Sequence, residues 1–249
     1  SDGQFFPTAR HGEAMNMVNA KYGSVPGLKA YTHVSDQFAP FACQSIPATV
    51  SDAPYILDGL LMNEVGRHVR EQYADTAGFT DHLFGASSLL GYNLVLRIRD
   101  LPSKRLYVFN PDTTPRELRK LVGGKAREDL IVANWPDIFR CAATMTAGKI
   151  RPSQLLRKLA SYPRQNNLAV ALREVGRIER TLFIIEWILD TDMQRRAQIG
   201  LNKGEAHHAL KNALRIGRQG EIRDRTTEGQ HYRIAGLNLL TAVIIYWNT

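Results

Sequence analysis

The stretch YADTAGFTDH, residues 73 to 82, places a carboxylate where a strand gives way to a turn and then to a helix. The residues before Asp75 (HVREQYA, 68 to 74) indicate a strand, and those after it indicate a turn of small residues and a helix over roughly 79 to 90. Asp75 alone decides little, because Asp is also a favoured turn and helix-cap residue. Its role depends on which other side chains the fold brings beside it.

The size and charge of the chain limit its class. With 249 residues, 44% of them hydrophobic, it can bury the core of one large domain or of one domain with an insertion. The formal net charge of +8 is uneven, since residues 1 to 100 hold 7 basic and 10 acidic residues while the rest hold 25 and 14. This asymmetry predicts a polyanion-binding surface in the second part. A solvated surface that only keeps the protein soluble is the alternative.

Cysteine spacing and hydropathy exclude several classes. Cys43 and Cys141 lie far apart without the spacing of a zinc site, so we expect buried free thiols in a reducing compartment. The most apolar run, LNLLTAVIIYW (237 to 247), is much shorter than the roughly 20 residues that cross a bilayer. No signal peptide is evident. The chain opens at SDGQFF without Met and ends in an apolar run, and we expect it to be a piece of a larger protein.

The order of predicted elements indicates an α/β fold. Strands are expected at 3 to 6, 28 to 34, 41 to 46, 68 to 74 and 93 to 101, with helices at 51 to 64 and 79 to 90. The second and third strands should form an antiparallel pair. Beyond about residue 110, apolar residues recur at three- and four-residue spacings, which predicts an all-helical block. We therefore expect a mixed five-stranded sheet flanked by helices, with the helical block as an insertion.

Three carboxylates occupy positions that suit phosphoryl-transfer chemistry. A ribonuclease H-like nucleotidyl transferase needs acids on its first strand, at the end of its fourth strand and on a late helix, because carboxylate oxygens hold two Mg²⁺ ions about 3.5 to 4 Å apart. Asp2 lies on the first predicted strand and Asp75 ends the fourth. Glu205, in GLNKGEAHHALKNAL, is the best placed acid on a late helix. It should lie near an inward face formed by Leu201, Ala209 and Leu210.

Other acidic residues have more ordinary explanations. Asp36 lies in a turn between strands, and Asp52 and Asp81 fall in first helical turns, where a carboxylate complements the helix dipole. Glu221 lies in a basic, loop-like stretch and is expected to be a surface ion-pair partner.

Adjacent histidines and missing nucleotide motifs exclude further alternatives. His207 and His208 point about 100° apart on a helix, which disfavours joint metal chelation and favours a solvated helix face. The sequence contains neither a phosphate-binding GxxxxGK[ST] loop nor a GxSxG elbow. Nucleotide-driven motors and serine hydrolases are therefore poor fits.

About ten sequence blocks, in order along nearly the whole chain, resemble the catalytic region of the Tn-three family transposases. They include SDGQFFP, YTHVSDQFAPF, ATVSDAPYILDGLL, YADTAGFTDHLFG, RIRDLPSKRLYV, GRIERTLF, LNKGEAHHAL, GEIRDRTTEGQ and GLNLLTAVIIYWN. Carried over residue by residue, the catalytic triad of that family falls on Asp2, Asp75 and Glu205. The resemblance also implies a ribonuclease H-like core in two parts, 1 to 109 and 193 to 249, separated by a helical insertion over 110 to 192.

The resemblance implies metal-dependent cleavage of DNA at transposon ends and transfer of the freed 3′-hydroxyl into target DNA during replicative, cointegrate-forming transposition. Two Mg²⁺ ions, replaceable by Mn²⁺, would serve as cofactors. The implied partners are transposon-end and target DNA, with a homodimer of the full-length protein in the bacterial cytoplasm, at the nucleoid, and no membrane. A basic DNA-binding or assembly module with an inactive acidic site is the alternative.

Basic residues near the predicted carboxylates are expected to contact DNA phosphates. The six are Arg97, Arg99, Arg164, Lys203, Lys211 and Arg215.

Overall fold

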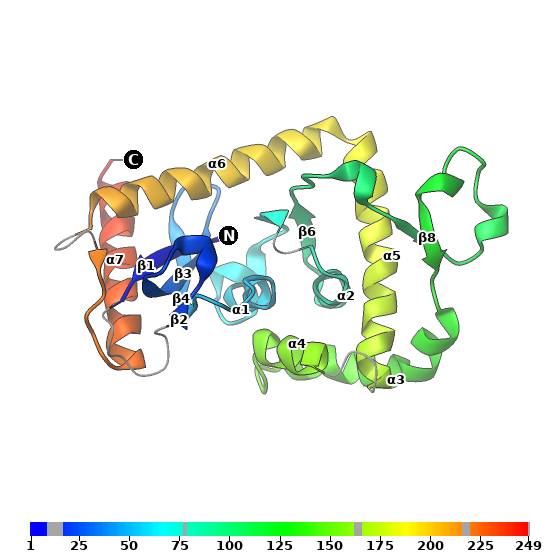
Figure 1. The fold of residues 1–249 in the computed structure, drawn as a ribbon, viewed down its shortest axis with the longest axis horizontal. Coiled ribbons are helices and arrows are strands. Elements are labelled where there is room, and N and C mark those ends of the chain that lie inside the picture. The colour runs from blue at the N-terminus through cyan, green and yellow to red at the C-terminus, as the bar shows by residue number, and fades with distance from the viewer. Residues whose placement is uncertain (9–16, 77–78, 162–165, 216–219, 249) are drawn as a thin grey trace. The chain divides into compact units, whose positions relative to one another are not determined.

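The computed structural model describes residues 1–8, 17–76, 79–161, 166–215 and 220–248. The chain divides into two compact units. Ser1–Asp52 together with Ile199–Thr249 form the first, here called the sheet unit, and Ala53–Gln198 form the second, the helical unit. The boundary between the units, at Gln198 and Ile199, falls within the residues of helix α6 (Thr191–Ala213), which is labelled in Figure 1.

The sheet unit contains a four-stranded antiparallel sheet centred on β3 (Pro26–Val34). This strand pairs with β1 (Asp2–Pro7), β2 (Met17–Val18) and β4 (Pro40–Pro47). The β3–β4 pairing confirms the predicted antiparallel pair. Since β3 has neighbours on both edges, most of its side chains are buried. Pro7, which lacks a backbone donor, is the last residue of β1, as the sequence predicts.

Helix α7 (Thr227–Trp247) covers the same sheet and packs against β4 (Figure 1). Its N-terminus is capped by Thr226, whose side chain accepts a hydrogen bond from the Gly229 amide at 3.0 Å. The buried apolar core of this unit draws on strands β1 and β3, on the segment before α7 and on α7 itself. Its members are Phe6, Leu28, Ala30, Ile222 and Ile234.

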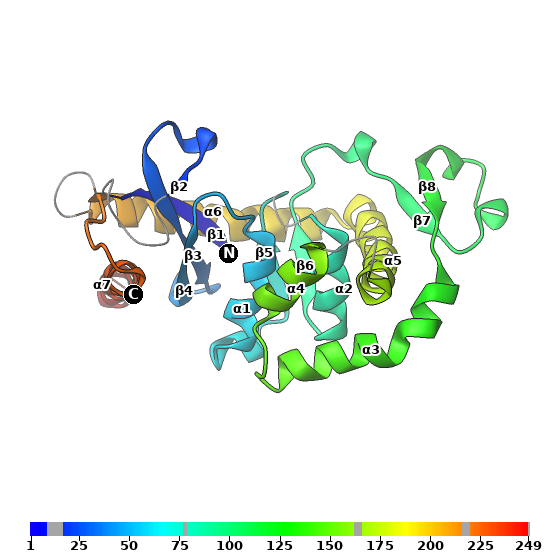
Figure 2. The ribbon, with the colours of Figure 1, turned by 60° about the horizontal axis from the view of Figure 1, so that its bottom comes forward.

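The helical unit consists mainly of helices with two short parallel strand pairs. Strand β5 (Glu71–Ala74) pairs with β6 (Asn93–Leu96), and β7 (Leu106–Val108) pairs with β8 (Val122–Lys125). Figure 2 shows β7 and β8 beside α5. The helices are α1 (Ile56–Leu61), α2 (Asp81–Leu89), α3 (Glu128–Thr146), α4 (Pro152–Ser161) and α5 (Asn167–Leu189).

A buried carboxylate ties α1 to α4. Asp58, on α1, accepts hydrogen bonds from the Ser153 amide at 2.8 Å and from the Ser153 hydroxyl at 2.5 Å. Burial is the main cause that raises the pKa of Asp58, and the hydrogen bonds from Ser153 oppose it. A buried carboxylate needs such donors, so these hydrogen bonds hold the first turn of α4 against α1.

Several elements are shorter than the sequence predicts. The strand expected over 68 to 74 is β5, Glu71–Ala74, and a 3₁₀ turn at Val65–His68 precedes it. The strand expected over 93 to 101 ends at Leu96. The helix expected over 51 to 64 is a 3₁₀ turn followed by α1.

The five expected strands do not share one sheet among the described residues, because β5 and β6 form a sheet of their own. The block expected to be all-helical contains β8, so that prediction is wrong at this point. The sequence of β8, VGGK, has two glycines and therefore no side-chain pattern, and pairing with β7 supplies its hydrogen bonds.

Residues of the described segments include no helix long and apolar enough to cross a membrane. Cys43 and Cys141 are both free and half-buried.

Close packing of α2 on α5 generates a stability prediction. A Cβ at Gly176, on α5, would lie 1.6 Å from the Asp81 carbonyl oxygen, whereas a Cβ at Gly236, on α7, meets nothing within 4 Å. We expect Gly176→Ala to lower the free energy of unfolding by about 1–3 kcal/mol. Gly236→Ala should raise it by up to about 1 kcal/mol, because alanine favours helix. Urea unfolding followed by circular dichroism measures both, and stabilisation by Gly176→Ala would contradict the close contact.

Candidate active site

Asp2 lies at the start of β1, on the face of the sheet that meets α6. It is paired in register with Thr32 of β3. One carboxylate oxygen accepts a hydrogen bond from the Gly3 amide at 2.7 Å, and the other lies 3.7 Å from Nδ1 of His208 on α6. The side chain is 35% exposed. Asp2 is therefore held beside α6 and still open to solvent.

Side-chain hydrogen bonds align β1 with α6 residue by residue. Nε2 of Gln4 donates to the His208 carbonyl oxygen at 3.3 Å and to Oδ1 of Asn212 at 2.7 Å. Further along, Nη2 of Arg215 donates to the Phe5 carbonyl oxygen at 3.2 Å. Gln4 thus meets the last turns of α6 and Phe5 meets Arg215 just after the helix, so strand and helix run in the same direction.

Glu205 extends this alignment by one helical turn. It lies three residues before His208 and so shares a face of α6 with it. Because His208 contacts Asp2, Glu205 projects at the end of β1 that carries Asp2. Its side chain is exposed, and among the described residues it has no hydrogen-bond or ion-pair partner. Helical spacing is therefore compatible with Glu205 lying near Asp2, and convergence of the two carboxylates stays a prediction.

The face that α6 turns toward the sheet is polar, which corrects two predictions. Ala209 is exposed rather than inward, and His207 and Lys211 are buried, at 2% and 1% exposure. Nζ of Lys211 donates to Oγ1 of Thr32 at 2.9 Å. The expected solvated face at the two histidines is wrong for His207. Lys211 cannot serve as a surface contact for DNA phosphates, because its ammonium group lies inside the unit.

Burial changes the protonation of this polar face. It lowers the pKa of His207 to about 3, and the positive charge of Lys211 acts in the same direction. Burial also lowers the pKa of His208, against the opposing effect of Asp2. The pKa of Lys211 is lowered as well, chiefly by burial. Among the described residues, neither ring nitrogen of His207 has a hydrogen-bond partner.

Asp75 belongs to the helical unit and directly follows β5, as predicted. Its carboxylate accepts a hydrogen bond from Nη2 of Arg99 at 2.8 Å, and the side chain is 37% exposed. Oγ1 of Thr76 donates to the Arg97 carbonyl oxygen at 3.0 Å, which joins the ends of β5 and β6. Exposed ion pairs contribute only about 0–1 kcal/mol, so Arg99 holds Asp75 weakly. Convergence of Asp75 with Asp2 and Glu205 stays a prediction.

The rival acids have ordinary structural explanations, as a turn residue or as ion-pair partners. Asp36 lies in an exposed turn, and Glu221 pairs with Arg223 at 3.4 Å, as expected. Asp81 lies in the first turn of α2, as expected, and also pairs with Arg180 at 2.5 Å.

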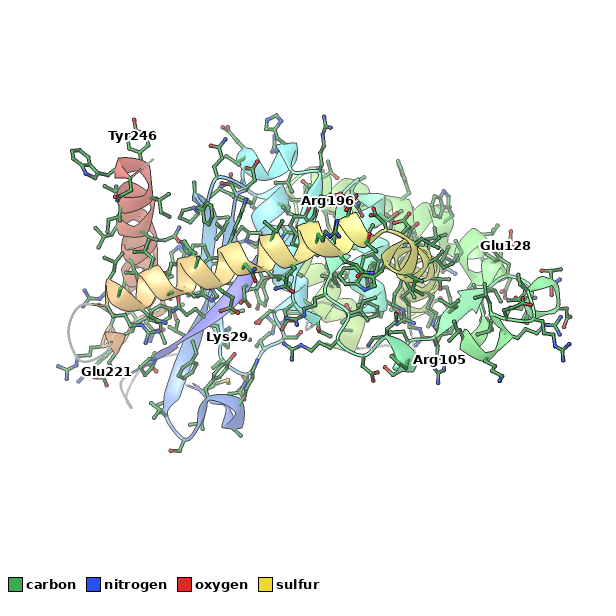
Figure 3. All side chains as sticks on the ribbon, turned by 90° about the horizontal axis from the view of Figure 1, so that it is seen from above. Lys29, Arg105, Glu128, Arg196, Glu221 and Tyr246 are labelled. Carbon is green, nitrogen blue, oxygen red and sulfur yellow. The ribbon has the colours of Figure 1, made fainter. Side chains whose placement is uncertain are left out.

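Asp52 corrects the prediction of a first-turn helical position, because it precedes the 3₁₀ turn and pairs with the buried Lys29. Lys29 projects from β3 (Figure 3), and its Nζ also donates to the Val50 carbonyl oxygen at 2.6 Å. Sequence reasoning missed this lysine, although a charged residue inside the apolar strand sequence PGLKAYTHV was a signal.

The other proposed DNA contacts differ in their surroundings. Arg97 and Arg99 are exposed. Lys203 donates to the Asp36 carbonyl oxygen and lies 5.1 Å from the centre of the Phe38 ring. The guanidinium of Arg215 lies 4.7 Å from the centre of the Phe6 ring and is half-buried. Arg164 lies outside the described residues.

The predicted ligands fit a hard divalent cation in their chemistry. Asp2, Asp75 and Glu205 offer carboxylate oxygens open to solvent, and neither a thiol nor an imidazole is needed to complete the set. Within the described segments, no three His, Cys, Asp or Glu side chains form a group that could hold a metal ion.

Comparison with known proteins identifies the family. The family model described as Tn3 transposase DDE domain matches residues 1–249. The chain belongs to this family. Over its full length it is 51% identical to the transposase for transposon Tn501 of Pseudomonas aeruginosa and 48% identical to that for Tn21 of Escherichia coli. Over 93% of its length it is 37% identical to the transposase for transposon gamma-delta of Escherichia coli strain K12.

The resemblance to Tn-three family transposases is therefore confirmed. This Tn3 transposase DDE domain spans about a quarter of the length of these relatives, 25%, 25% and 23% respectively.

The burial of Lys211 generates a test of its structural role. Lys211→Met keeps the stem and removes the buried charge, so we expect the free energy of unfolding at pH 7 to rise by about 1 kcal/mol. Because burial lowers the pKa of Lys211 from 10.5, the unfolded chain binds more protons below that pH, and wild-type stability rises with pH in this window. The advantage of the variant should shrink as the pH rises toward 10.5.

Urea unfolding between pH 7 and 10 measures this, with Lys203→Met as the control. Lys203 is half-buried and should give no such pH-dependent gain. If Lys211→Met instead reduced the salt dependence of DNA binding, Lys211 would be a phosphate contact after all.

Proposed function

We propose that this chain is the catalytic domain of a DNA transposase, which cleaves DNA strands at transposon ends and transfers the freed 3′-hydroxyl into target DNA. The observation that carries the proposal is the alignment of β1 with α6, in which Asp2 lies beside His208, one helical turn from Glu205. Family membership supports it, since the curated relatives are transposases. Replicative, cointegrate-forming transposition belongs to the same proposal.

We also propose the ribonuclease H-like fold for the domain, with the core in two parts, 1 to 109 and 193 to 249, and an insertion over 110 to 192. The observed antiparallel pairings of β3 with β1 and β4 and the parallel pairing of β5 with β6 suit this fold. In that fold, the acid that ends the fourth strand lies next to the acid of the first strand. Asp75 directly after β5 has the required position in the chain.

Asp2, Asp75 and Glu205 are the side chains that would hold Mg²⁺, or Mn²⁺ in its place. When bound, two such ions activate the attacking oxygen and stabilise the leaving oxygen of a phosphodiester. The Gly3 amide fixes the orientation of Asp2 and leaves its second oxygen open toward α6. Glu205 has no competing partner among the described residues. A metal ion at Asp75 would replace at least one contact between Arg99 and the carboxylate. Because exposed ion pairs are weak, losing this contact costs little free energy.

DNA is the proposed partner, as transposon ends and as target. Arg97 and Arg99 are exposed where β6 ends, next to Asp75, so they are placed to meet phosphates on either side of the cleaved bond. For the whole protein, we propose a homodimer acting on DNA in the bacterial cytoplasm.

A second candidate is a basic DNA-binding or assembly module whose acidic residues are unused. The pairing of Asp75 with Arg99 favours it, because a neutralised carboxylate attracts a cation less. The two candidates differ in their response to metal. Mg²⁺ or Mn²⁺ should raise the Tm of a catalytic domain and leave that of the module unchanged.

Substitution of the carboxylates tests the proposal in the full-length protein. Asp75→Asn and Glu205→Gln keep size and remove charge, so strand cleavage and joining should fall at least about a hundredfold while binding of transposon ends changes little. Asp36→Asn, in an exposed turn of the sheet unit, is the matched control and should retain activity. Cleavage and strand transfer are measured on labelled transposon-end DNA with Mg²⁺. Near-normal cleavage by Asp75→Asn would refute the assignment of Asp75.

A further inference from the structure

Cations and aromatic rings alternate in a row within the helical unit. Nζ of Lys104 lies 4.7 Å from the centre of the Phe79 ring, and the guanidinium carbon of Arg180 lies 5.8 Å from the same centre. Arg180 and Arg177 lie 5.4 Å and 4.4 Å from the centre of the Tyr107 ring. We call Lys104, Phe79, Arg180, Tyr107 and Arg177 the cation–aromatic row.

The row is fixed by packing on α5. Arg177 and Arg180 lie one turn apart on this helix. The Tyr107 amide donates to Oγ1 of Thr181 at 2.8 Å, which holds β7 against α5. Phe79 packs edge-on against Phe84 of α2, with ring centres 5.3 Å apart. The rings therefore hold the cations in set positions rather than leaving them free to rotate in solvent.

Acidic partners neutralise only part of the row. Arg180 pairs with Asp81 at 2.5 Å, and Arg177 pairs with the fully buried Glu174 at 2.6 Å. Lys104 is half-buried and has no acidic partner among the described residues. It shares the ring of Phe79 with a second cation, Arg180. Asp81 and Glu174 balance the two arginines, so the charge of Lys104 is the part of the row that an added anion could neutralise.

The row is close to Asp75 along the chain. Phe79 follows Asp75 by four residues, and Lys104 follows Arg99, the partner of Asp75, by five. Fully extended, the segment from Asp75 to Phe79 spans at most about 14 Å. A DNA strand places successive phosphates about 3.4 Å apart along the helix axis, so the Phe79 end of the row lies within about five nucleotides of a phosphodiester held at Asp75.

A purely structural role explains only part of this arrangement. Pairing of Arg177 and Arg180 with Glu174 and Asp81 clamps α2 to α5 and needs no ligand. Lys104 contacts the Phe79 ring but takes no part in these ion pairs.

We propose that the cation–aromatic row is a subsite for a DNA backbone phosphate, with Lys104 as the direct contact and Arg180 as the charge behind it. This rests on the proposed function only in taking DNA as the substrate. The phosphate lies within a few nucleotides of the bond cleaved at Asp75. The ligand chemistry is a phosphodiester, so this subsite contributes affinity and position but no base specificity.

The test uses the full-length protein and a transposon-end duplex, with Lys104→Ala compared with Lys158→Ala. Lys158 is an exposed lysine of α4 in the same unit, outside the row. We expect Lys104→Ala to lower the slope of log K against log salt by about one and to leave the Tm unchanged. Lys104→Arg should restore the slope, because it restores the charge.

Neutral methylphosphonate linkages, introduced one at a time within five nucleotides of the cleavage site, locate the contact. Wild-type protein should lose affinity at one of these positions, and Lys104→Ala should show no further loss there. An unchanged slope for Lys104→Ala, or a lowered Tm with an unchanged slope, would overturn the subsite in favour of the structural clamp.

The proposed function fails separately from the subsite. Cleavage that survives Asp75→Asn would remove the catalytic assignment while the salt slope of Lys104→Ala still reports on phosphate binding. Conversely, Asp75→Asn could lose cleavage while Lys104→Ala keeps the wild-type salt slope and the wild-type response to methylphosphonate linkages. That result would refute only the subsite.

Discussion

The alignment of β1 with α6 is the contact on which the candidate site depends. It consists of directed hydrogen bonds from Gln4 to the His208 carbonyl and Asn212, reinforced by Lys211 on Thr32. Apolar packing tolerates sliding, whereas hydrogen bonds between particular atoms set one register. A one-residue slip of β1 would turn Asp2 to the other face of the sheet. The polar interface therefore controls whether Asp2 and Glu205 share a side of α6.

Local patterns were enough to predict strands β1, β3, β4 and β5 and the position of Asp75 directly after β5. The short strands β1, β3 and β4 are rich in aromatic and apolar residues bounded by turns, and Asp75 directly follows a strand, as expected. Such features depend on neighbours in the sequence. The family was also recognisable, because ordered blocks over the whole chain carry more information than any single motif.

Long-range polar pairs were not predictable in this way. The buried face of α6 holds His207 and Lys211 where periodicity favoured Leu201, Ala209 and Leu210. A lysine is buried only when its ammonium finds an acceptor, here Thr32, which lies 179 residues earlier in the chain. Sequence reasoning also missed the pairing of Lys29 with Asp52 and the strand β8. The reason is the same, because each depends on a partner elsewhere in the chain.

The basic charge of the chain consequently divides between two roles. Some cations are paired inside the fold. Lys211 donates to a hydroxyl, and Arg177 and Arg180 contact acidic side chains and the Tyr107 ring. Other cations lie close to Asp75 in the chain and are less fully paired. Arg99 has only its exposed ion pair with Asp75, and Arg97 and Lys104 have no acidic partner among the described residues. Net charge thus overstates the positive charge that is available to DNA phosphates, because part of it is paired inside the fold. The candidate catalytic carboxylates are likewise weakly engaged, which leaves their oxygens free for a cation that the fold itself does not supply.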